Sequence, residues 1–198
     1  MLCAVSCMNE LGQYAPIVFL PDLMAKEHGI PPLQAGNIIL FYGVSNTVGR
    51  LTGGIMASYM ENSTLLLVAV CMLFKGSSCF GMASASYYWQ FVILICMHGT
   101  CVGIFKVLRT ISLVSMFGVA SLNDTNGIVM FGNGCSSLLG PPMVGWLKVY
   151  WGTYYYAFVV TAAIYIVRGF LALILVSENK KDKYHMTCDK IGEGVTKK

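Results

Sequence analysis

Charge is scarce in this 198-residue sequence, in which 11% of the residues are charged and 56% are hydrophobic. A soluble domain carries about 25% charged residues, so this chain lacks the polar groups that would cover a water-facing surface. The net charge of +4 comes without a basic stripe of the kind that binds nucleic acid. We therefore expect lipid to be the main solvent, and we expect no nucleic-acid partner.

Patterns of enzymatic and metal-binding chemistry are missing as well. The eight cysteines form no CxxC pair, and all but Cys188 lie in apolar segments. In such segments cysteine usually acts as a small apolar residue with a free thiol. Neither an HExxH pair nor a GxSxG turn occurs. We therefore expect no metal, no cofactor and no catalytic residue, and the chain is not predicted to be an enzyme.

The sequence instead contains long apolar segments. Six of them approach the roughly 20 residues that cross a bilayer. They run near Leu2–Leu20, Gln34–Tyr59, Leu65–Ala83, Tyr87–Leu108, Ile128–Leu147 and Tyr155–Val176. The prediction is an all-α membrane protein with six transmembrane helices over residues 1–178, followed by a polar, disordered cytoplasmic tail over residues 179–198.

Three connecting or breaking elements are predicted between these spans. Residues 21–33 form a connection, and residues 109–127 form an amphipathic turn or short helix that ends in a polar loop at residues 123–127. The Gly-Pro-Pro stretch at residues 140–142 is expected to interrupt the fifth span, because proline removes a backbone donor.

The distribution of lysine and arginine predicts the orientation. Lysines at residues 180–183 follow the last span, and Lys106 and Arg109 follow the fourth. These positions share one side, so both termini are expected in the cytoplasm. The opposite ends of the spans carry aromatic residues that would form an outer belt. These are Tyr87, Tyr88, Trp89, Trp146, Tyr150, Trp151, Tyr154, Tyr155 and Tyr156.

Small residues recur at every fourth position of the second span. This spacing places them on one ridge, where another helix can approach closely. A second, shorter pair of glycines in the fourth span has the same spacing. The first set is Ser45, Gly49, Gly53 and Ala57, and the second is Gly99 and Gly103.

Four charged residues fall inside the predicted spans, namely Glu10, Arg50, Lys75 and Arg168. Each lies roughly 12–15 Å from the cytoplasmic end of its helix at 1.5 Å per residue, and charges at such depth usually face a cavity or a partner. The positive excess suits a small carboxylate, which the flat guanidinium of Arg50 fits bidentately. We predict substrate contacts from Arg50, Asn46 and Lys75. Glu10 is the candidate charge partner or coupling residue.

Three stretches resemble the monocarboxylate transporters, a branch of the major facilitator superfamily. Residues 13–20 (QYAPIVFL) are similar to that family's seventh helix, residues 46–54 (NTVGRLTGG) to its eighth, and residues 138–147 (LLGPPMVGWL) to its eleventh. The resemblance covers roughly Leu2–Val176. It implies the C-terminal six-helix half of a twelve-helix fold, with the substrate between the two halves.

The resemblance also implies a function, which is transport of a small organic anion across the plasma membrane by alternating access. Arg50 would bind the substrate carboxylate. Proton symporters of the family carry an aspartate where this chain has Asn46, which favours facilitated diffusion or coupling through Glu10. The implied partners are a first six-helix half and, for some members, a single-span ancillary glycoprotein.

Two alternatives stay open at this point. One is a non-transporting membrane scaffold or regulatory fragment that assembles through the small-residue ridges. The other is a facilitator of aromatic amino acids or related solutes without proton coupling.

Two N-glycosylation sequons, which begin at Asn62 and Asn123, test the predicted orientation. Both fall on the expected cytoplasmic side, so neither should carry sugar. We expect the chain expressed in mammalian cells to migrate identically before and after endoglycosidase treatment. A sugar-dependent shift that disappears in Asn62→Gln or in Asn123→Gln would reverse the orientation.

Overall fold

The computed structural model describes residues 10, 12–13, 15–59, 64–117 and 122–174, which form helices and turns without strands. The predicted all-α class is therefore confirmed over these ranges. The elements are η1 (Ala15–Phe19), α2 (Leu20–Lys26), α3 (Pro32–Tyr59), α4 (Thr64–Ser84), α5 (Tyr88–Phe117), α6 (Leu122–Trp151) and a last helix, Tyr155–Ile174. Five of the six predicted spans match these long helices. Most of the first span and the whole predicted tail lie outside the described residues.

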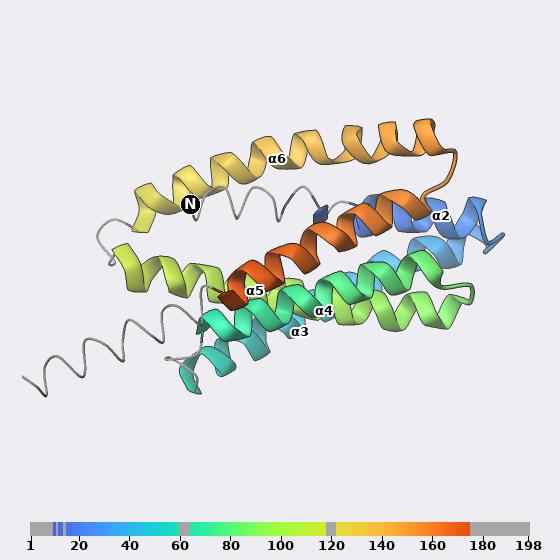
Figure 1. The fold of residues 1–198 in the computed structure, drawn as a ribbon. Coiled ribbons are helices and arrows are strands. Elements are labelled where there is room, and N and C mark those ends of the chain that lie inside the picture. Colours follow the sequence, from blue (N-terminus) through green and yellow to red (C-terminus); the bar gives the residue numbers. More distant parts are fainter. Residues whose placement is uncertain (1–9, 11, 14, 60–63, 118–121, 175–198) are drawn as a thin grey trace, which may run out of the picture.

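The long helices form one bundle in which successive helices run in alternating directions (Figure 1). α5 is central, because it packs against α3, α4 and α6. The last helix packs on α4, where Ile166 lies against Gly76 and Leu73 lies against Gly169. Burying apolar faces in this way leaves many large side chains on the outside, as expected of a protein whose solvent is lipid.

Three predictions about connections are corrected. Residues 123–127 lie in the first turns of α6, because Asn and Asp, which are common in polar loops, are also favoured at a helix start. The Gly-Pro-Pro stretch does not interrupt α6, which runs through Pro141 and Pro142. The φ of proline is compatible with a helix, and membrane helices tolerate the donor that each proline removes and the carbonyl that its ring crowds. Part of the connection at residues 21–33 is α2, with Pro21 in its first turn, where a missing N–H costs little.

Within the described ranges, three helices are both long and apolar enough to cross a membrane, namely Leu66–Ser84, Tyr88–Ile111 and Tyr155–Ile174. α3 and α6 are as long, with 28 and 30 residues, which at 1.5 Å per residue exceeds the roughly 30 Å of a bilayer core. They are less apolar than the other three. A spanning helix with a polar face needs protein or water beside that face.

The predicted ridge of small residues on α3 is confirmed, because Ser45, Gly49, Gly53 and Ala57 are all buried. α3 and α5 approach so closely that a Cβ at Gly49 or Gly103 would overlap the backbone of the facing helix. At Gly53 an added Cβ would lie 2.9 Å from the Cα of Ile104. Only glycine allows this close backbone contact between α3 and α5.

The aromatic residues predicted to form a belt lie at one end of the bundle, where α4 turns into α5 and α6 into the last helix (Figure 1). Several pair through their rings. Trp146 stacks on Tyr150 at 5.7 Å between ring centroids, and Trp151 lies 5.3 Å from Tyr156. Such amphipathic rings favour the headgroup level of a bilayer.

A polar cluster fastens the connecting segments at this aromatic end. The Tyr154 hydroxyl donates to Asp22 of α2, whose carboxylate also lies 2.9 Å from the Lys26 amine. The backbone N–H of Tyr154 donates to Glu27 at 2.9 Å. The hydrogen bonds from the Tyr154 hydroxyl and, to a smaller extent, from the Lys26 amine hold the pKa of Asp22 below its usual value. Burial raises the pKa of Tyr154 to about 12. The cluster joins α2 to the start of the last helix.

Two glycine-to-alanine substitutions on α3 are predicted to change the stability of the bundle in opposite directions, because only one of the two glycines contacts α5. Gly49→Ala should destabilise the bundle by about 1–3 kcal/mol, because its methyl group would overlap the Thr100 backbone. Gly54→Ala meets nothing within 4 Å and should be neutral or stabilising by up to about 1 kcal/mol. Thermal unfolding in detergent measures both. Equal melting temperatures for the two variants would contradict the close packing.

Candidate functional site

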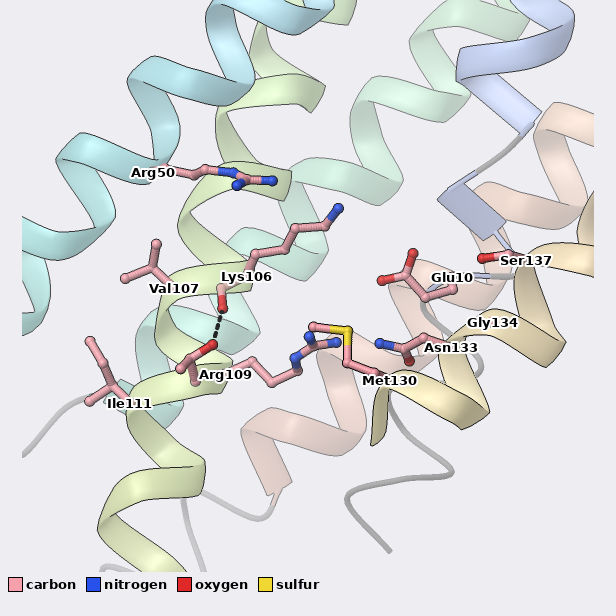
Figure 2. Close-up of a pocket in the computed structure, with 11 residues that line it drawn as sticks. Glu10, Arg50, Lys106, Val107, Arg109, Ile111, Met130, Asn133, Gly134 and Ser137 are labelled. Carbon is pink, nitrogen blue, oxygen red and sulfur yellow. Dashed lines mark hydrogen bonds between the residues drawn. The ribbon is translucent and has the colours of Figure 1, made fainter. Parts of the chain in front are cut away.

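A cavity of about 610 Å³ opens between the helices. Its walls come from four parts of the chain, namely the segment before η1, α3, α5 and α6 (Figure 2). The polar residues among those that line it are Glu10, Arg50, Lys106, Arg109, Thr110, Asn133 and Ser137. The two less apolar helices, α3 and α6, thus turn polar side chains to this cavity.

Arg50 extends from α3 with its guanidinium directed into the cavity (Figure 2). Its Nε donates to the Asn46 side-chain oxygen at 3.1 Å. The Asn46 amide donates to the Tyr42 hydroxyl at 3.3 Å, and so does the Gln13 amide, also at 3.3 Å. Asn46 and Arg50 therefore lie on one face of α3. This relay orients the guanidinium, and none of the described residues bonds to its two terminal amino groups.

Glu10 lies across the cavity from Arg50, with its carboxylate directed toward the amine of Lys106 (Figure 2). The side chain is buried although it lines the cavity. The structure thus brings together two of the predicted charged residues, Glu10 and Arg50. Their predicted roles as coupling residue and substrate contact stay predictions.

Lys75 does not line the cavity. It is fully buried, and its amine lies 4.4 Å from the ring centroid of Tyr165 and 5.4 Å from that of Phe105. Aromatic faces attract a desolvated cation, so the bundle interior holds Lys75 apart from the residues that line the cavity. Arg168 is buried too.

Five polar residues of the cavity were missed as site residues from the sequence, namely Lys106, Arg109, Thr110, Asn133 and Ser137. Lys106 and Arg109 were assigned to the flank of the fourth span, because a charge usually marks the end of a span. α5 instead continues to Phe117, which puts both cations inside the helix. Lys106 and Arg109 are three residues apart, which places them on one helix face. This spacing was the feature of the sequence that could have identified both as site residues.

Comparison with known proteins adds an independent line of evidence. The family model described as "Major Facilitator Superfamily" matches residues 2–185. The chain is similar to monocarboxylate transporter 9 of Mus musculus, with 26% identity over 167 residues. It is also similar to monocarboxylate transporter 2 of Meriones unguiculatus, with 25% identity over 190 residues, and to monocarboxylate transporter 4 of Rattus norvegicus, with 24% identity over 166 residues.

These alignments cover most of this chain and a minor part of each relative. They include 84%, 87% and 83% of the chain but 33%, 38% and 35% of the three relatives, in the order given. The chain therefore spans about a third of the length of the curated relatives it matches.

Proposed function

This chain belongs to the major facilitator superfamily, and we propose that it forms the C-terminal six-helix half of a carrier for small organic anions. The observation that carries the proposal is Arg50, a cation on a membrane-length helix, oriented by Asn46 and directed into a cavity. A charge at this depth needs water, a counter-ion or a ligand. A carboxylate supplies both the opposite charge and two acceptor oxygens for the guanidinium.

The electrostatics of the cavity favour an anion. Arg50, Lys106 and Arg109 line it, against a single described acid, Glu10. An excess of fixed positive charge in a low-dielectric cleft raises the local concentration of small anions. The names of the relatives, all monocarboxylate transporters, support a carboxylate as the cargo.

Alternating access is the mechanism that suits this architecture. The glycine contact makes α3 and α5 one unit, so Arg50, Lys106 and Arg109 would move together when one half rocks against another. Two rigid halves exchange access to a midplane site without any covalent step. The first six-helix half would close the open side of the cavity, and a single-span ancillary glycoprotein is a further proposed partner. The plasma membrane, with both termini cytoplasmic, is the proposed location.

The side chain at position 46 affects whether transport can be coupled to the movement of a proton. Its amide holds Arg50 in place but carries no titratable proton. We therefore propose either facilitated diffusion or coupling through Glu10, which is the described acid in the cavity.

Uptake of labelled pyruvate tests the proposal. Proteoliposomes should contain this chain co-expressed with the first six-helix half of a monocarboxylate transporter. Arg50→Gln should lower uptake at least about tenfold, because a charge-assisted pair to the carboxylate is worth roughly 1.5–3 kcal/mol. Thr47→Val, a neutral change on an exposed part of the same helix, is the matched control and should keep parental uptake. Equal uptake by Arg50→Gln and the parent would remove Arg50 from the mechanism.

A further inference from the structure

Arg109 is the most unusual side chain of the cavity. It is 7% exposed, and both its Nε and its Nη1 are inaccessible and without a hydrogen-bond partner among the described residues. A buried guanidinium normally pairs with a carboxylate or with several acceptors, because desolvating its charge is costly. The fold thus presents a charged donor group, directed into a cavity, whose acceptor does not come from the described chain.

Asn133 of α6 faces it. Asn133 is 8% exposed, lines the same cavity, and its side-chain oxygen has no hydrogen-bond partner in the part of the chain that the structure describes. Figure 2 shows its amide nitrogen directed toward the end of Arg109. Two donors that face each other cannot bond to one another. An acceptor placed between them would bond to the Arg109 guanidinium and to the Asn133 amide nitrogen, but it would give no donor to the Asn133 oxygen, which is itself an acceptor.

This pair lies at a different depth from Arg50. A Cβ added to Gly103 of α5 would lie 2.8 Å from the backbone nitrogen of Arg50, so these two residues are level. Arg109 follows Gly103 by six residues, or about 9 Å along the helix at 1.5 Å per residue. It is therefore farther than Arg50 from the aromatic end of the bundle. Lys106 stands between the two levels and lines the same cavity.

From this geometry we infer that Arg109 and Asn133 form a second carboxylate-binding position in the cavity, separate from Arg50. The inference rests on the proposed function, because it assigns the same small organic anion a second contact along its path. The Arg109 guanidinium supplies the positive charge, and the Asn133 amide supplies a neutral donor from the facing helix. An anion released by Arg50 passes Lys106 and reaches this position on the way to the end opposite the aromatic belt.

The decisive variant is Asn133→Asp, which places a fixed carboxylate opposite Arg109. The probe is pyruvate, titrated by saturation-transfer NMR against the full chain in lipid nanodiscs. We expect the melting temperature to rise, because Arg109 gains a counter-ion, while pyruvate affinity falls about tenfold, because the position is filled. Arg109→Gln should lower the affinity by a similar factor, and Arg109→Lys should restore part of it.

Two controls accompany these variants. Cys135→Ser, an exposed change on α6, should leave both readouts unchanged, and the uncharged analogue pyruvamide should not bind detectably. A higher melting temperature for Asn133→Asp with parental pyruvate affinity would overturn the inference. It would show that Arg109 and Asn133 act only as a structural pair.

The failure of this inference is distinguishable from failure of the proposed function. If Arg50→Gln weakens pyruvate binding while Asn133→Asp and Arg109→Gln do not, the second position is wrong and the proposed function stands. If the parent chain binds pyruvate no better than pyruvamide, both are overturned.

Discussion

The contact between α3 and α5 determines where the charges of this protein can point. Gly49 and Gly103 leave no room for a side chain between the two backbones, so the rotation of α3 about its axis is fixed. The next residue along the helix is turned by about 100°, which directs Arg50 away from α5's backbone and into the cavity. A larger residue at Gly49 would separate the helices and change the direction of Arg50.

Fixed backbones explain how the fold tolerates charge at membrane depth. Arg50 has Asn46 and Tyr42 behind it, and Lys75 has aromatic rings around it. Each charge is thus held by neutral polar or aromatic groups, while Arg50, Lys106, Arg109 and Glu10 share the cavity. The proposed anion would meet a positive potential there, because the described lining carries three cations and one acid.

Much of this architecture could be predicted from the sequence. Apolar length predicted five of the long helices, and the four-residue spacing of small residues predicted the face that α3 presents to α5. The length of α5 could not be predicted, because Lys106 and Arg109 look like the flank of a span when the cavity that solvates them is unknown. The aromatic partners of Lys75 could not be predicted either, because Phe105 and Tyr165 are far apart in sequence and are brought together only by packing.

The central claim is that Arg50 faces water rather than lipid. Cysteine accessibility tests it most directly, with Arg50→Cys and Leu51→Cys introduced separately into a chain whose eight native cysteines are serine. Leu51 is exposed on α3 but does not line the cavity. With a water-soluble, charged thiol reagent in proteoliposomes, we expect rapid labelling at position 50 and little at position 51. Labelling at position 51 with none at position 50 would contradict the account.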